Sequence, residues 1–277
     1  RLCGGDYISR TPPASVELTS TDGFTVHAYL FAPRGRVKGG VVTIHGGPLD
    51  RSYPEYSPQI AFLVDLGFEV LAVDYRGSAG YGPEYMNASD NNYLGMVADV
   101  QSATTFLESR YQAGSYNLPI FLLGESIGSL LAQSTVMAGE HKISGLISIS
   151  GLSNIFDPSA KSLLVNTNFS RPGTEAIHRI FGGGPIREEN IDETTFDLLA
   201  YQSLNSEFVP SLFIHGALDR NIPIQQSEYI VNRIQSNGTY AEVVSIDKGS
   251  HDIRCRGCRA EILSEIEAFL SSLTETD

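Results

Sequence analysis

The sequence contains no uninterrupted apolar run long enough to cross a lipid bilayer, for which a helix needs about 20 such residues. No segment with a charged start and an apolar stretch opens the chain, as a secretory signal would. These absences exclude a membrane-spanning protein and predict a cytoplasmic location. The chain begins at Arg1 rather than Met, so a removed leader or a longer parent protein stays open as the alternative.

Positive charge is scarce as well. The chain carries 19 Lys and Arg residues against 32 Asp and Glu residues, which gives a formal net charge of −13. An acidic surface of this kind repels phosphate backbones, so nucleic acid is excluded as a partner. We attribute the acidity to solubility, and steering of a cationic substrate is the less favoured interpretation.

Cysteine is rare, with three residues at Cys3, Cys255 and Cys258. A small odd number is typical of a reducing compartment. The last two form a C-x-x-C pair, but a zinc site would need about two further ligands. A redox site would need the pair at the head of a helix in a thioredoxin-like unit. The sequence therefore predicts no metal site and favours free thiols, with a structural disulfide as the alternative and redox or metal function least favoured.

The pattern of apolar residues predicts an α/β fold. Residues 15–20 and 24–30 alternate in polarity on either side of a Thr-Asp-Gly turn, which predicts an antiparallel hairpin. Apolar strands then alternate with helices, which is typical of a mostly parallel sheet covered on both faces. The expected strands are 41–44, 68–73, 119–123, 143–149, 210–214 and 241–246, and the expected helices are 58–67, 96–110, 127–138, 224–235 and a last one around 262–273.

One segment interrupts this alternation. Residues 152–208 lie between two expected strands and are longer than an ordinary crossover. We expect them to form an inserted cap over the carboxyl edge of the sheet. Residues 1–277 are then a single domain that contains the cap.

A nucleophile motif lies between an expected strand and an expected helix. Residues 124–128 read Gly-Glu-Ser-Ile-Gly and match G-x-S-x-G. A sharp strand-to-helix turn requires small residues on either side of the serine and holds its hydroxyl above the sheet edge. The context predicts Ser126 as a nucleophile, with a serine in an ordinary tight turn as the alternative.

A serine nucleophile needs a base and a group that orients the base. The fold places an acid and then a histidine in loops after later strands. Asp219 follows the expected strand 210–214, and His251 follows 241–246. We therefore predict Asp219 and His251 as the partners of Ser126. His215, at a strand end, is expected to make local hydrogen bonds.

The loop of residues 45–48 follows the expected strand 41–44 and reads His-Gly-Gly-Pro. Such loops supply a backbone N–H to an oxyanion hole, because glycine lets the backbone approach the developing charge. We predict the N–H groups of Gly47 and Ile127 as the oxyanion donors, with a plain turn as the alternative for the glycines.

The chain carries a set of five motifs: residues 45–48, the Asp-Tyr-Arg-Gly-Ser-Ala-Gly-Tyr-Gly stretch 74–82, the elbow 124–128, residues 215–223 and residues 249–251. In this set the chain resembles the catalytic domain of the prolyl-oligopeptidase family, in particular its acylaminoacyl-peptidase and dipeptidyl-peptidase-like branch. The resemblance implies an α/β-hydrolase fold, a Ser-Asp-His triad, hydrolysis of short peptides or acylated amino acids, and no cofactor.

The chain departs from the family pattern in several places. It contains no residues for the β-propeller that family members usually carry. Ile127 stands where a tyrosine is common, and Ser129 replaces the second glycine after the nucleophile. Asn221 stands where some members have an arginine that binds a substrate carbonyl, and His45 stands where some have an oxyanion-assisting tyrosine.

The sequence thus predicts a serine hydrolase that works through an acyl-enzyme, most favourably on short peptides or N-acylated amino acids. A small-molecule esterase or thioesterase, or an acyltransferase, is the alternative, and a non-catalytic binding module is remote. Phe156 in the cap is predicted as a wall of the substrate pocket, with a core role as the alternative, and Asn221 as a further substrate-binding residue. The oligomeric state stays open.

Overall fold

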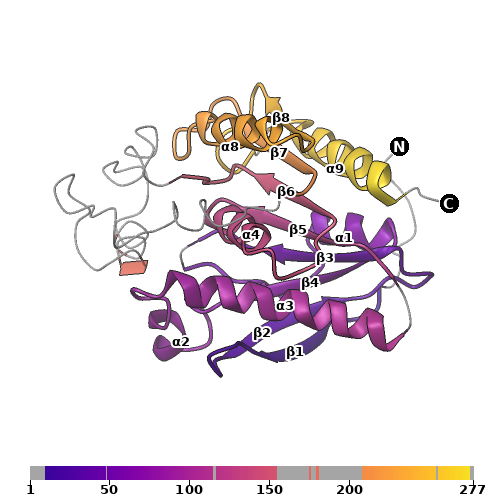
Figure 1. Cartoon of the computed structure of the whole chain (residues 1–277), viewed down its shortest axis with the longest axis vertical. Coiled ribbons are helices and arrows are strands. Elements are labelled where there is room, and N and C mark those ends of the chain that lie inside the picture. The colour runs from indigo at the N-terminus through magenta and orange to yellow at the C-terminus, as the bar shows by residue number, and fades with distance from the viewer. Residues whose placement is uncertain are drawn as a thin grey trace.

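The computed structural model of the 277-residue chain describes residues 10–47, 49–114, 117–154, 175, 179–180, 208–253 and 255–274. The described strands form one sheet in the order β1-β2-β4-β3-β5-β6-β7-β8, as Figure 1 shows. The strands are β1 (Ala14–Thr19), β2 (Thr25–Phe31), β3 (Gly39–Ile44), β4 (Phe68–Asp74), β5 (Ile120–Glu125), β6 (Gly145–Ile149), β7 (Ser211–Gly216) and β8 (Ala241–Ile246).

Strand directions follow the predicted pattern. β1 pairs with β2, and β2 with β4, in antiparallel register, whereas β4, β3, β5, β6, β7 and β8 run parallel. The predicted hairpin and the predicted mostly parallel sheet are therefore confirmed. Because the parallel strands all end at one edge, the loops that follow β3, β5, β7 and β8 come together there.

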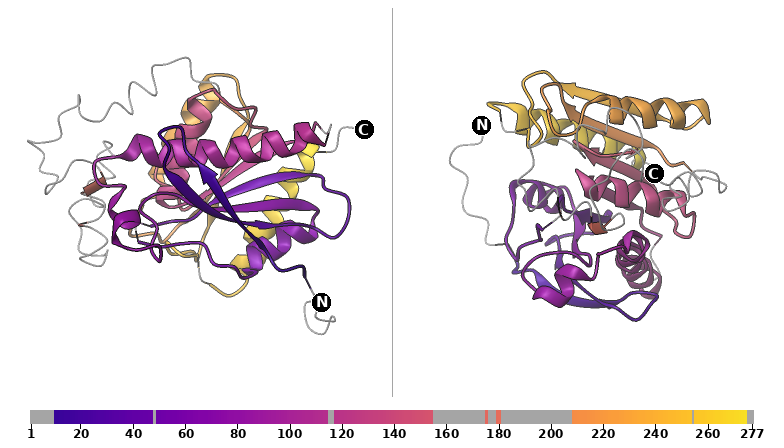
Figure 2. Two further views of the ribbon diagram at one scale, coloured as in Figure 1. Left: turned by 90° about the horizontal axis from the view of Figure 1, so that it is seen from below. Right: turned by 90° about the vertical axis from the view of Figure 1, so that its left-hand side faces the viewer.

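The described helices of five residues or more cover both faces of the sheet (Figure 2). They are α1 (Pro58–Asp65), α2 (Pro83–Asn87), α3 (Tyr93–Ala113), α4 (Ile127–Met137), α8 (Gln225–Ser236) and α9 (Cys258–Thr274). Helices α3, α4 and α8 pack in one buried cluster, and α1 and α9 pack in the other. Side chains of β5 alternate between the clusters: Leu122 joins the first, and Phe121 and Leu123 join the second.

Most of the predicted cap lies outside the described residues. Of residues 152–208, only 152–154, 175, 179–180 and 208 are described, so Phe156 lies outside the described residues. The two described residues 179–180 contact the main body. Ile180 is buried in the α3 and α4 cluster, and the carbonyl of Arg179 accepts a hydrogen bond from the N–H of Asn91 at 2.7 Å.

The structure corrects the prediction of free thiols at the C-x-x-C pair. Cys255 and Cys258 are joined in a disulfide. The turn that starts α9 brings their Cα atoms to 5.3 Å, which is within the range that a disulfide requires. Since disulfides persist mainly in oxidising compartments, this pair weighs against the predicted cytoplasmic location, which stays a prediction.

Within the described part of the chain, no helix is long and apolar enough to span a membrane.

Candidate active site

Ser126 occupies the sharp turn between β5 and α4. Its backbone φ is 53°, in the left-handed region, and its N–H donates to the carbonyl of Ile149 at 3.0 Å. Both motif positions require glycine because neither has space for a Cβ atom. A Cβ atom on Gly124 would overlap the backbone of residues 128–129, and one on Gly128 would overlap the carbonyls of residues 44–45. The turn therefore matches the predicted nucleophile elbow.

The structure brings the three predicted triad side chains together. Nε2 of His251 lies 3.2 Å from Oγ of Ser126, and Nδ1 of His251 lies 2.8 Å from Oδ2 of Asp219. Asp219 follows β7 and His251 follows β8, and these strands are parallel neighbours. The side chain of Asp219 is fully buried, whereas that of His251 is 17% exposed at the sheet edge.

Asp219 is fixed by its own loop. Its Oδ1 accepts the backbone N–H groups of Asn221 at 2.8 Å and Ile222 at 2.9 Å, which leaves Oδ2 for His251. Burial raises the pKa of Asp219, but hydrogen bonds with His215 and His251 outweigh it, and the pKa falls below the ordinary value. The carboxyl is thus held ionised, as an acceptor for an imidazole N–H.

His215 supports Asp219 from the end of β7. Its Nε2 lies 2.8 Å from the carbonyl of Ile222 and 3.4 Å from Oδ2 of Asp219. A carbonyl only accepts, so Nε2 carries the proton and Nδ1 accepts from the hydroxyl of Ser227 at 2.8 Å. The expected local hydrogen bonds are confirmed. The contact with the acid was not predicted, and its only signal in the sequence is the spacing of four residues.

The two predicted oxyanion donors lie on adjoining backbone segments. A Cβ atom on Gly47 would sit 3.8 Å from Cγ2 of Ile127, and one on Gly46 would sit 3.3 Å from Cβ of Ser126. The loop after β3 therefore passes directly beside the first turn of α4. Pro48, the last residue of the predicted motif, lies outside the described residues.

Residues of the stretch 74–82 hold the loop of residues 45–47 in place through hydrogen bonds. The Tyr75 hydroxyl donates to the carbonyl of His45 at 3.1 Å. The His45 imidazole bonds the Ser78 hydroxyl through Nε2 at 2.8 Å and lies 3.6 Å from Asp74. Burial lowers the pKa of His45, although the Asp74 charge opposes the shift. Asp74 also accepts from the N–H of Ser52 at 2.5 Å and from the hydroxyl of Tyr81 at 2.6 Å.

Arg76, in the same stretch, is buried and anchors it to the fold. Its guanidinium donates to Asp99 on α3 at 2.7 and 2.9 Å and to Asp22 in the hairpin turn at 2.6 and 2.9 Å. It also lies over the ring of Phe24, 4.4 Å from the centroid. Such a bidentate, buried arrangement fixes position, so the motif that carries the family resemblance is a support for the loop after β3.

The departure at Ser129 has a local explanation. The Ser129 hydroxyl lies 2.5 Å from that of Ser148 on β6 and accepts from the side chain of Gln133 at 2.9 Å. Gly151 gives it room, because a Cβ atom there would overlap the Ser129 side chain. The serine that replaces a family glycine is therefore compensated by a glycine elsewhere.

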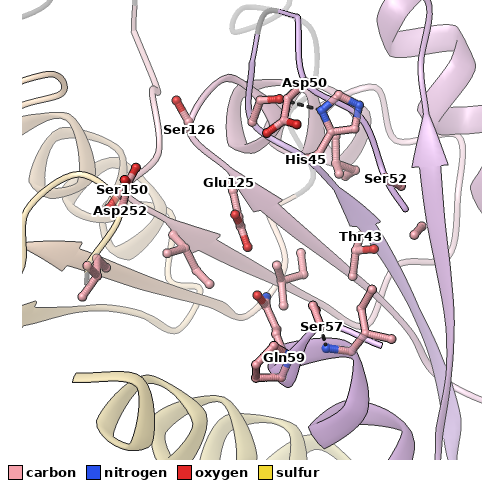
Figure 3. A pocket seen from close by; sticks show the side chains of 18 of the residues that line it. Thr43, His45, Asp50, Ser52, Ser57, Gln59, Glu125, Ser126, Ser150 and Asp252 are labelled. Carbon is pink, nitrogen blue, oxygen red and sulfur yellow. Dashed lines mark hydrogen bonds between the residues drawn. The ribbon is translucent and has the colours of Figure 1, made fainter. Parts of the chain in front are cut away.

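A cavity of about 1430 Å³ adjoins the triad. Ser126, His251, Gly47 and Asn221 all line it, together with residues of α1, α9 and the loop of residues 49–57. Figure 3 shows part of this lining. Asn221, predicted as substrate-binding, is therefore at the cavity.

Among the described residues, no group of three or more His, Cys, Asp or Glu side chains could hold a metal ion.

Solved structures with the same fold define the class of protein. An acylaminoacyl peptidase of Pyrococcus horikoshii matches with a TM-score of 0.77 at 19% identity, over 98% of this chain and 43% of that one. An esterase of Pyrococcus furiosus matches with a TM-score of 0.72 at 18% identity, over 96% of this chain and 92% of that one. The chain has the α/β-hydrolase fold, as predicted.

Sequence comparison then gives the family. The model of the prolyl oligopeptidase family matches residues 54–276, so the chain belongs to that family. An uncharacterized peptidase of Bacillus subtilis is 22% identical over 254 residues, which cover 88% of this chain and 36% of the relative. The chain thus spans about a third of the length of this curated relative.

Proposed function

We propose that the protein is a serine peptidase that cleaves short peptides or N-acylated amino acids through an acyl-enzyme. One observation carries the proposal: Ser126, His251 and Asp219 form a continuous hydrogen-bonded series at the edge of the sheet. Membership of the prolyl oligopeptidase family supports peptide chemistry. No cofactor is part of the proposed mechanism.

The hydrogen bonds support a proposed role for each triad member. If the Asp219 carboxylate accepts from Nδ1 of His251, that nitrogen carries a proton and Nε2 can accept the proton of Ser126. Oγ of Ser126 then attacks the substrate carbonyl, and Asp219 stabilises the imidazolium that forms. His251 returns the proton to the leaving group, and water releases the acyl group by the reverse sequence.

The developing oxyanion needs donors that are already in place. We assign the backbone N–H groups of Gly47 and Ile127, which lie on adjoining segments beside Ser126. Ile127 is the first residue of α4, so the positive end of the helix dipole faces the same point. The hydrogen bond from Tyr75 to the carbonyl of His45 holds the Gly47 segment in position.

Substrate recognition is assigned to the cavity and to the cap. Asn221 lines the cavity, and its backbone N–H donates to Asp219, so a substitution of its side chain tests binding while the hydrogen bond to the acid is kept. Phe156 is our proposal for the acyl or side-chain wall, and it rests on the sequence alone. A small peptide or acylated amino acid fits a cavity of this size.

Hydrolysis of a small ester is the second candidate function. The similarity to the Pyrococcus furiosus esterase extends over 92% of that chain, whereas the Bacillus subtilis peptidase is matched over 36% of its length. The same triad attacks esters and amides, and an amine in place of water would make the protein an acyltransferase.

A substrate panel separates the candidates. We would measure kcat/KM for aminoacyl and acyl-aminoacyl p-nitroanilides beside short p-nitrophenyl esters. A peptidase cleaves the anilides with a clear preference for certain side chains. Turnover of esters alone would favour the second candidate, and no turnover with no fluorophosphonate labelling of Ser126 would overturn both.

A further inference from the structure

Glu125 comes immediately before Ser126 in the chain, but the two side chains point in different directions. Along β5, Phe121 and Leu123 point to the face covered by α1 and α9, and residues two apart share a face. Glu125 is the last residue of β5 and continues this series. Figure 3 shows its side chain directed into the cavity towards Gln59 of α1.

The cavity opens on this face near the sheet edge. Val41, Val70 and Phe121 lie deeper in the α1 and α9 cluster. Nearer the edge, Thr43, Ala72 and Leu123 take the corresponding positions and line the cavity, and Ala72 is much smaller than Val70 on the same strand. The space therefore extends from Ser126 and His251 down between the two helices, with Glu125 on its wall.

The cavity lining is acidic on balance. Its charged side chains are four carboxylates, Asp50, Glu55, Glu125 and Asp252, and two guanidinium groups, Arg51 and Arg259. Arg51 already donates to the carbonyl of Ser52 at 3.0 Å and to the hydroxyl of Tyr29 at 3.2 Å. A cavity lined in this way favours a positively charged ligand.

Glu125 is the carboxylate nearest to the proposed nucleophile along the chain, and its environment disfavours its charge. Burial raises the pKa of Glu125, the Asp50 and Asp252 charges add to the shift, and the hydrogen bond from Gln59 and the His251 ring oppose it. A carboxylate that is half-buried and surrounded by like charges gains from a cationic partner.

We propose that Glu125 is a specificity residue, and that the cavity between α1 and α9 binds a cationic group of the substrate, an ammonium or a guanidinium, through the Glu125 carboxylate. The assignment rests on the proposed function, because it places the charged group of a substrate whose carbonyl lies at Ser126. The cation is either the side chain of a basic residue or a free α-amine, and both present the same chemistry to the carboxylate.

The test compares three p-nitroanilides: N-acetyl-lysyl, N-acetyl-norleucyl and norleucyl. If only esters turn over, the matching p-nitrophenyl esters replace them. The ratio of the first to the second reports a cationic side chain, and the ratio of the third to the second reports a free α-amine. We expect one ratio to be well above one in the wild type and to fall about 10- to 100-fold in Glu125→Gln, because a hydrogen bond to a charged group is lost.

Glu267→Gln is the matched control, since Glu267 is an exposed carboxylate on α9 that is not among the residues lining the cavity. It should leave both ratios unchanged, whereas Glu125→Gln should cost the cationic substrate far more than the N-acetyl-norleucyl substrate. Three results would overturn the proposal: wild-type ratios near one, an equal loss for every substrate in Glu125→Gln, or the same loss of ratio in Glu267→Gln.

Binding of a simple cation tests the site without turnover. Calorimetry with butylguanidinium and Ser126→Ala protein should show binding that weakens about tenfold or more in Ser126→Ala/Glu125→Gln. Equal affinity in the two proteins would overturn the cation site. Absence of fluorophosphonate labelling at wild-type Ser126 would instead reject the proposed function, so the two failures are distinguishable.

Discussion

The Tyr75 hydroxyl donates to the carbonyl of His45 at 3.1 Å, and the Tyr75 ring stacks on the His45 imidazole with centroids 4.4 Å apart. Tyr75 is buried, and burial raises the pKa of its hydroxyl, which therefore stays protonated and can donate. The accepting carbonyl of His45 belongs to the peptide group just before the one that carries the Gly47 N–H, which we assign to the oxyanion hole. Tyr75 is thus a positioning residue for that segment.

Tyr75→Phe should lower kcat about tenfold with little change in KM. The loss is smaller than the roughly 10²- to 10³-fold cost of removing an oxyanion donor itself, because the donor remains and only its support is lost. Steady-state kinetics on the best substrate of the panel checks this. Tyr93→Phe is the control, since Tyr93 is also buried and its hydroxyl lies 2.7 Å from that of Ser134. It should lower the melting temperature and leave kcat unchanged.

Ser126→Ala should remove fluorophosphonate labelling and lower kcat by on the order of 10⁴- to 10⁶-fold. Asp219→Asn should cost on the order of 10⁴-fold with labelling slowed, because an amide no longer enforces the proton on Nδ1 of His251. Ser134→Ala on the same helix α4 serves as the control and should label like the wild type. Stoichiometric labelling of Ser126→Ala would show that another serine is the nucleophile.

Asp22 should contribute stability that depends on pH in a defined window. Its hydrogen bond to Arg76 lowers the pKa of Asp22 from 3.8 to about 2. The unfolded chain then binds the proton more readily, so stability rises with pH. The melting temperature of the wild type should exceed that of Asp22→Asn above about pH 4, and the difference should shrink as the pH falls towards about 2. The Asp22 side chain is 51% exposed, so solvent screening keeps the difference small. A difference that persists undiminished at about pH 2 would contradict this assignment.

The Cys255–Cys258 disulfide predicts the thiol reactivity of these two cysteines. Neither should react with maleimide in the unfolded, unreduced protein. Mass spectrometry should find both labelled after reduction. Because the bond closes a very short loop, the double variant to alanine should lose only about 2 kcal/mol of unfolding free energy. Labelling of Cys255 and Cys258 before reduction would mean that no disulfide joins them.

Several features could be predicted because they depend on neighbours in the sequence. Apolar runs of strand length, alternating with helical periodicity, indicate the parallel sheet and its two helical layers. The glycines at 124 and 128 indicate the elbow, since the turn leaves no space for a side chain at either position. The order of Ser126, Asp219 and His251 after successive strands indicates their meeting at one edge, because parallel strands end there together.

Other features depend on which distant segments meet, and only the tertiary structure decided them. Nothing local shows that Tyr75 reaches the carbonyl of His45. Glu125 shows most clearly how the tertiary structure decides what a side chain meets. The sequence places it beside Ser126, but the pleat of β5 turns it to the other face, into the cavity that Thr43 of β3 and Ala72 of β4 also line. A strand pattern determines the face that a side chain takes, whereas the packing of remote helices determines what that face meets.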